Sequence, residues 1–182
     1  MVTETVILRP TSFYQGSGGN SADLQPYPAE TLAENYHLLV SEITPDDDAT
    51  YVYNAKTLLA TTGFCFTPLN INNVPTNIKI VYRARTTVAN SNIKACIRYL
   101  DEGGSVGGYN NFNSTDLTES YTTYSVSIPA DYITKFWNLL TSTTISADDI
   151  KYHVSFIIGT SSSDSKATAD ARVTHLYLEV EY

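Results

Sequence analysis

One stretch of the sequence carries the clearest structural signal: Asn77-Ile78-Lys79-Ile80-Val81-Tyr82-Arg83-Ala84-Arg85-Thr86. Side chains of an extended chain alternate between two faces, which puts Ile78, Ile80, Tyr82 and Ala84 on one side and Lys79, Arg83 and Arg85 on the other. The segment Asn92–Leu100 repeats this period-two pattern. We therefore predict two half-buried strands, paired as a hairpin through residues 87–91.

Strand-like patterns recur along the whole chain, in Thr3–Arg9, Tyr36–Ile43, Thr50–Asn54, Leu58–Thr67, Ser120–Ile128, Lys151–Ile158 and Arg172–Tyr182. Only the segment after Pro129 has helical spacing, with Ile133, Phe136 or Trp137, and Leu140 on one face. This helix is expected to cap an open end of the fold. About nine strands are enough to form two packed sheets. The sequence thus predicts an all-β protein, a jelly-roll-like antiparallel β-sandwich with one short helix.

No domain boundary interrupts this pattern, so residues 1–182 are expected to form a single domain. Two long irregular segments lie within it, Thr11–Leu32 and Asp101–Thr118, both rich in glycine. Loops of this length in a compact domain often carry function.

The composition restricts the classes of partner. The 182 residues carry a formal net charge of −8, and 42% of them are hydrophobic. This acidic balance disfavours nucleic acid and anionic membranes, which attract cationic surfaces. No apolar run approaches the roughly 18 residues of a membrane span. The first residues lack the pattern of a secretion signal, so we expect synthesis in a cytosol, with Cys65 and Cys96 reduced.

Catalytic motifs are missing from the sequence. His37, His153 and His175 stand alone, without the spacing of a metal site, and no nucleophile elbow or phosphate-binding glycine loop is present. His175 is expected to be a half-buried structural residue. We predict that the protein is not an enzyme; polysaccharide cleavage would require two carboxylates across a cleft, which a sequence alone does not reveal.

Tyrosine offers the strongest binding signal, because the chain holds 14 of them. The aromatic residues Tyr14, Tyr27, Tyr109 and Phe112 lie in the two long irregular segments, where rings can stack on sugar faces. The alternative is that tyrosine serves as a strand and interface residue.

Two clusters of charge are further candidates. Asp46, Asp47 and Asp48 adjoin one another and offer oxygen ligands for Ca²⁺, the one cofactor we consider; the alternative is a solvated turn or cap. The basic residues Lys79, Arg83, Arg85, Lys94 and Arg98 would form a cationic stripe on one sheet face if the predicted hairpin forms. Such a stripe predicts an assembly contact with acidic residues of the same molecule or of a second copy, or else an ordinary charged outer face.

Four segments together resemble virion structural proteins of tailed bacteriophages: Val6-Ile7-Leu8-Arg9-Pro10-Thr11, Pro45-Asp46-Asp47-Asp48-Ala49-Thr50-Tyr51-Val52-Tyr53, Val81-Tyr82-Arg83-Ala84-Arg85 and the ending Ala171–Tyr182. The resemblance implies a β-sandwich component of a capsid or tail, of the decoration, fibre or adhesion type. It assigns no functional residue.

The resulting expectation is a non-enzymatic phage particle protein, made in the host cytoplasm and located in the virion. It would act by homo-oligomeric assembly with other virion proteins and by surface binding. The alternative is a carbohydrate-binding or receptor-binding module that uses its tyrosine-bearing loops to hold a glycan, such as one on a host surface.

Overall fold

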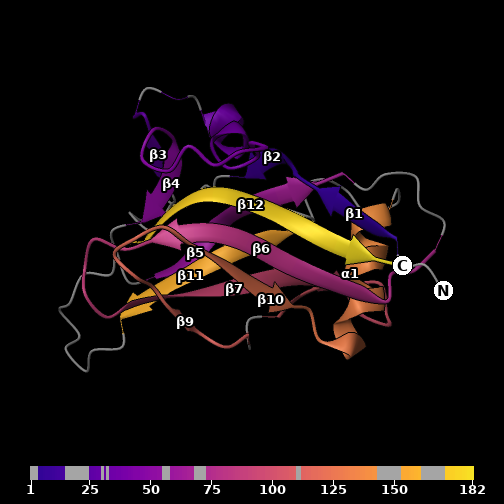
Figure 1. Cartoon of the computed structure of the whole chain (residues 1–182). Helices are drawn as coiled ribbons and strands as arrows, with labels where there is room; N and C mark the ends of the chain where they lie inside the picture. Colours follow the sequence, from indigo (N-terminus) through magenta and orange to yellow (C-terminus); the bar gives the residue numbers. More distant parts are fainter. Residues whose placement is uncertain are drawn as a thin grey trace.

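The computed structural model describes residues 4–14, 25–29, 31, 33–54, 58–67, 73–109, 112–142, 153–160 and 171–182. Two antiparallel sheets face each other, and one α-helix lies at one end of the pair (Figure 1). The first sheet has the order β10 (Thr122–Ser127), β6 (Asn77–Arg85), β12 (Ala171–Glu181), β4 (Tyr51–Asn54), β3 (Gln25–Tyr27), with β1 (Thr5–Leu8) also paired to β12. The second sheet has the order β2 (Pro10–Tyr14), β5 (Leu58–Phe66), β11 (Val154–Thr160), β7 (Ser91–Leu100), β8 (Val106–Tyr109), with β9 (Thr115–Asp116) also paired to β7.

The chain crosses between the two sheets repeatedly. β4, β6, β10 and β12 belong to the first sheet, whereas β5, β7, β8 and β11 belong to the second. The orders β4-β12-β6-β10 and β5-β11-β7-β8 are those of a jelly roll, in which the chain passes back and forth between two sheets. The predicted all-β, jelly-roll-like antiparallel sandwich with one helix is therefore confirmed.

The core is formed by the inner faces of the two sheets. Ile78, Ile80 and Tyr82 of β6 are fully buried, as are Ile93 of β7 and Phe156 of β11. These side chains belong to one hydrophobic cluster that extends across both sheets. The period-two pattern of the sequence therefore marks the core-facing side chains of β6, β7 and β11 correctly.

The predicted hairpin between the two strongest strands is wrong. β6 pairs with β10 and β12, whereas β7 pairs with β8, β9 and β11. Both strands have one strongly apolar face, and each turns it toward the other across the core instead of forming one continuous apolar surface. Residues 86–90 therefore connect the two layers, and the five basic side chains do not share a face.

The predicted strand Tyr36–Ile43 is also wrong, because Ala33–Leu39 forms the 3₁₀-helix η1. Tyr36, Leu39 and Val40 are buried, while Leu38 is exposed. Buried positions three and four residues apart follow a helical period, not a strand period. The two long segments are also less irregular than expected, since β2 and β3 lie within the first and β8 and β9 within the second.

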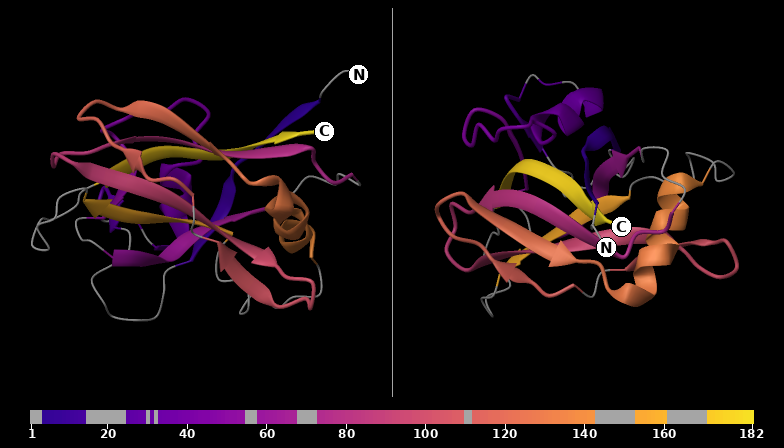
Figure 2. Two further views of the ribbon diagram at one scale, coloured as in Figure 1. Left: turned by 90° about the horizontal axis from the view of Figure 1, so that it is seen from below. Right: turned by 45° about the vertical axis from the view of Figure 1, so that its right-hand side comes forward.

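The predicted helix is present as α1 (Ala130–Thr141), directly after Pro129. Its inward face carries Ile133, Phe136, Trp137 and Leu140, all buried in the common core. Two further views show α1 beside one end of the two sheets (Figure 2). The helix thus caps an open end of the sandwich.

We expect Ile80→Ala to lower the free energy of unfolding by about 2–5 kcal/mol, because it leaves a cavity between the sheets. The matched control is Ile43→Ala, the same chemical change at a side chain that is 83% exposed, where the expected effect is within about 0.5 kcal/mol. Denaturant-induced unfolding measures both. Equal losses in the two variants would contradict the assigned core.

His153 is a buried neutral residue that joins β5 and β7 within the second sheet. Its Nδ1 accepts a hydrogen bond of 3.0 Å from the backbone N–H of Phe66. Its backbone N–H donates to Phe64 O, and its carbonyl accepts from the N–H of Arg98. Burial lowers the pKa of His153 from 6.5 to about 4.

Acid is therefore expected to weaken the fold through His153. The unfolded chain binds this proton below about pH 6.5 and the native state only near pH 4, so stability falls as the pH drops through this window. The full effect is roughly 3 kcal/mol. Unfolding free energies of the wild type and of His153→Asn, which keeps an acceptor but does not titrate, measure it. The same pH dependence in both proteins would exclude His153 as the cause.

Candidate functional site

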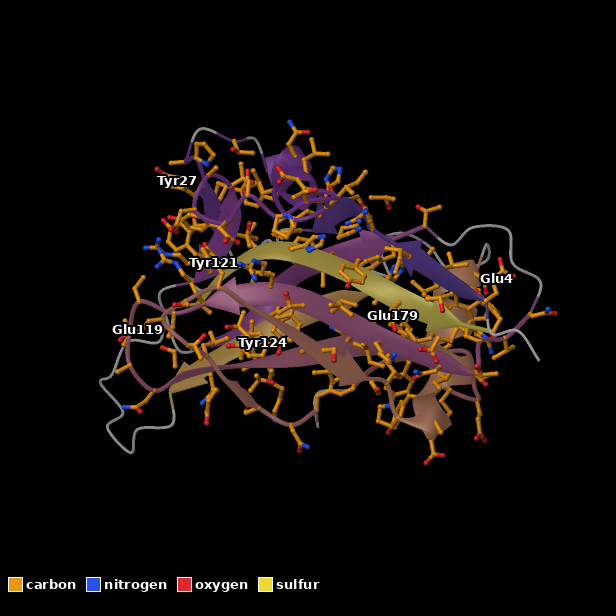
Figure 3. The ribbon with its side chains drawn as sticks, in the orientation of Figure 1. Glu4, Tyr27, Glu119, Tyr121, Tyr124 and Glu179 are labelled. Carbon is orange, nitrogen blue, oxygen red and sulfur yellow. The ribbon has the colours of Figure 1, made fainter. Side chains whose placement is uncertain are left out.

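The candidate site is the outer face of the first sheet near β3 and β4. We call it the tyrosine–arginine face and define it by six residues: Tyr27, Tyr51, Tyr53, Tyr121, Arg85 and Arg172. Figure 3 shows Tyr27 and Tyr121 at the same end of this sheet, whereas Glu4 and Glu179 lie toward the other end.

Strand register brings these residues together from distant parts of the sequence. Tyr53 lies opposite Gln25 on one side and Arg172 on the other, and Arg172 lies opposite Arg85. Pro26, Val52 and Ala84 point inward and are buried, so their neighbours in the chain point outward. A row of polar and aromatic side chains therefore crosses the sheet.

Aromatic stacking organises one half of the face. The rings of Tyr27 and Tyr51 are nearly parallel, at 11°, with centroids 4.7 Å apart. Tyr53 meets Tyr51 edge-on at 5.9 Å, and the Arg172 guanidinium lies 4.9 Å from the Tyr51 ring centroid. Tyr51 is only 7% exposed, whereas Tyr27 is 45% exposed. Tyr51 thus supports a ring that remains open to solvent.

Tyr121 organises the other half. The guanidinium carbons of Arg83 and Arg85 lie 5.7 and 5.1 Å from its ring centroid. Burial raises the pKa of Tyr121 to about 12, so its hydroxyl stays protonated at neutral pH. These cation–π contacts hold the guanidinium groups beside the sheet surface.

The turn at residues 46–48 folds over these arginines. Asp47 accepts two hydrogen bonds from Arg83, at 2.6 and 2.9 Å, and these bonds hold the pKa of Asp47 below its ordinary value. Asp48 Oδ1 accepts one from Arg85 Nη2 at 2.7 Å. The same oxygen lies 3.5 Å from Arg172 Nη1 and 3.4 Å from the Tyr121 hydroxyl.

The structure therefore joins residues for which the sequence predicted three separate roles. Tyr27 was predicted to bind sugar, Arg83 and Arg85 to form an assembly contact, and Asp47 and Asp48 to bind calcium. Among the residues described, Asp46 does not contact the arginines. Its carboxylate accepts hydrogen bonds from the backbone N–H and the hydroxyl of Thr50, and these bonds close the turn.

The calcium site that the sequence offers at this turn stays untested. Asp47 and Asp48 already pair with arginines, and within the described ranges no group of three or more acidic, histidine or cysteine side chains is placed to hold a metal ion. A bound ion would have to separate these ion pairs.

We accordingly expect added Ca²⁺ to leave the thermal unfolding midpoint unchanged, since the carboxylates would lose their arginine partners on binding it. A ligand that binds only the native state raises this midpoint, so calorimetry with Ca²⁺ and then with excess EDTA measures the effect. A rise that EDTA reverses would establish a calcium site; Asp47→Asn would then show whether this turn provides it.

The other predicted residues lie elsewhere. Phe112 is buried in the core cluster, beside a surface hollow of about 440 Å³ that Thr115 and Val126 also line. The side chains of Tyr14 and Tyr109 lie outside the described residues, although their backbones end β2 and β8 in the second sheet. The four predicted rings therefore do not form one described site.

The basic stripe is divided in the same way. Lys94 and Arg98 belong to β7 in the second sheet. Lys79 lies in the first sheet, toward the end away from Arg85, and forms ion pairs of 2.6 and 2.8 Å with Glu179 and Glu181. The acidic counterparts of Lys79, Arg83 and Arg85 thus belong to the same molecule. The predicted role of these residues in assembly stays untested.

Sequence reasoning missed Tyr51, Tyr53, Tyr121 and Arg172. The pattern Tyr51-Val52-Tyr53 could have indicated two rings on one strand face, opposite an inward valine. No local signal could have found Tyr121 or Arg172, because their positions depend on the strand order.

His175 lies at a gap along β12, between the stretch paired with β4 and the stretch paired with β1. Its Nε2 lies 2.9 Å from Nη1 of Arg9, which also donates to the carbonyl of Glu42 at 2.7 Å. Burial, and then the Arg9 charge, lower the pKa of His175. It is a buried acceptor, which agrees with the prediction of a structural histidine. The prediction that the protein is not an enzyme stays untested.

In the part of the chain that the structure describes, no helix has both the length and the apolarity needed to span a bilayer.

Comparisons with known proteins assign the chain to no family. No family model and no curated protein matches the chain. Among solved structures, it is similar to the CBM22-1 xylan-binding domain from Paenibacillus barcinonensis Xyn10C, with a TM-score of 0.48 and 8% sequence identity. The match covers 96% of this chain and 92% of that one. These findings give no support to the phage resemblance of the sequence.

Proposed function

We propose that this protein is a non-catalytic binding module whose tyrosine–arginine face holds an oligosaccharide or a polysaccharide chain. One observation carries the proposal: Tyr27 is an exposed ring, held parallel to the buried ring of Tyr51, which also contacts the Arg172 guanidinium group. The apolar C–H face of a pyranose can stack on the tyrosine ring, because the face of an aromatic ring carries partial negative charge. Its hydroxyl groups pair with carboxylates and guanidinium groups, and charged groups form the stronger hydrogen bonds.

The shape of the face suits an extended ligand. Strands of a sheet lie about 4.8 Å apart, so the four steps from β3 to β10 span roughly 19 Å. This length accommodates a short oligosaccharide chain. The side chains are already fixed by stacking and by ion pairs, which lowers the entropy cost of binding.

The virion role implied by the sequence resemblance, with its homo-oligomeric assembly, stays a prediction. A glycan-binding face does not conflict with it, because an adhesion protein needs such a face. Nothing in the geometry of the described residues favours a capsid or a tail location.

Substitution of Tyr27 tests the proposal. We expect Tyr27→Ala to weaken binding about tenfold, because the stacking surface is lost. Isothermal titration against a panel of neutral and acidic oligosaccharides measures it, and light scattering checks that the mass is unchanged. The control is Val74→Ala, another exposed apolar side chain, which precedes the opposite end of β6. Undiminished affinity of Tyr27→Ala, or a wild type that binds no member of the panel, would refute the proposal.

A further inference from the structure

On the arginine side of the tyrosine–arginine face, the hydrogen bonds converge on one carboxylate oxygen. All three contacts to Asp48 described above reach a single oxygen, Oδ1, and two of them are long, at 3.4 and 3.5 Å. The Nε of Arg85 is buried and has no hydrogen-bond partner among the described residues. A buried donor without an acceptor is unfavourable, so an acceptor that reached this guanidinium group would be stabilised.

Asp48 differs from its neighbour in how firmly it is held. Asp47 uses both carboxylate oxygens against Arg83, a bidentate pair of fixed geometry. Asp48 has one short bond, and its side chain is 60% exposed. Ion pairs this open to water contribute little to stability. The Asp48 carboxylate is therefore the part of this network that a ligand can most easily displace.

We propose that the site recognises uronic acid units, and that the carboxylate of Asp48 occupies the position of the ligand carboxylate when the site is empty. The proposal rests on the glycan-binding function proposed above and names its ligand class. Guanidinium groups match planar carboxylates with two parallel hydrogen bonds. Arg85 and Arg172 lie directly opposite each other on the neighbouring strands β6 and β12, and Asp48 contacts both.

The aromatic half of the face explains why the carboxylate would belong to a sugar. Arg172 stacks on one partner of the Tyr27–Tyr51 pair, so the arginines and the exposed Tyr27 ring are separated by one buried ring. One unit of a chain can then place its carboxylate on Arg85 and Arg172 while a nearby unit stacks on Tyr27. The net charge of −8 does not prevent this, because at physiological salt the screening length is about 8 Å.

The test uses oligomers of galacturonate, glucuronate and mannuronate, each paired with its methyl ester, which removes the charge and keeps the sugar. We expect the wild type to bind at least one acid form and to bind its ester more weakly. Asp48→Asn should strengthen binding of that acid form about five- to tenfold, because the competing internal charge is gone, and should not strengthen binding of the ester. Asp131→Asn, which removes an exposed charge from α1, is the matched control and should change neither.

The outcomes separate the two proposals. Equal binding of acid and ester, with weaker binding by Asp48→Asn, would show that Asp48 pairs with neutral hydroxyl groups; the uronate inference would then be wrong and glycan binding retained. Loss of acid binding in Arg85→Gln, with thermal unfolding unchanged, would place the carboxylate at the arginines. Binding of neutral sugars alone overturns the uronate inference, and binding of no sugar overturns both proposals.

Discussion

The structure depends on β12, whose side chains alternate between the core and the outer surface of the first sheet. Leu176, Leu178 and Val180 fill the core, and this fixes the rotation of the strand about its own axis. The positions between them must then face outward, among them Glu179, which meets Lys79 of β6. Because β12 pairs with β6 on one edge and with β1 on the other along this stretch, this rotation sets the outward faces there. A register shift between Val173 and His175 then resets the alternation, so that Val173 faces the core and Arg172, opposite β4, faces outward. The tyrosine–arginine face is thus a geometric consequence of the core and of this register shift.

The outer face must also balance its own charges. Three arginines, Arg83, Arg85 and Arg172, lie close together on β6 and β12, and like charges on neighbouring strands repel each other. The turn at residues 46–48 supplies two carboxylates against them. The turn thus belongs to the face structurally, although in the sequence it precedes the strand β4 that it helps to position.

Local periodicity explains why the fold class and most strands could be predicted. The apolar face of β6 and the helix after Pro129 follow directly from side-chain spacing. The pairing of the strands could not be predicted in the same way. Residues 86–90 are short enough to form a hairpin between β6 and β7, and equally able to connect the two sheets. The η1 segment was misread because Tyr36, Leu39 and Val40 satisfy a helical period within a stretch rich in strand formers. Arg172 joins the site only through the pairing of β12 with β4 and β6, which the sequence does not reveal. Tyr27 was recognised as a candidate from its residue type and its place in a long loop segment.

The interleaved order of the strands has a consequence for how the protein folds. β6 lies between β10 and β12, so its partners along the chain are far away, and Lys79 is paired with Glu179. Contacts between residues so distant in sequence make folding slow, because long loops must close before any contact rewards them. A nascent chain that lacks β12 has neither a closed core nor Arg172. The tyrosine–arginine face is therefore complete only at the end of folding, and under the proposed function a bound glycan would report that the whole sandwich has formed.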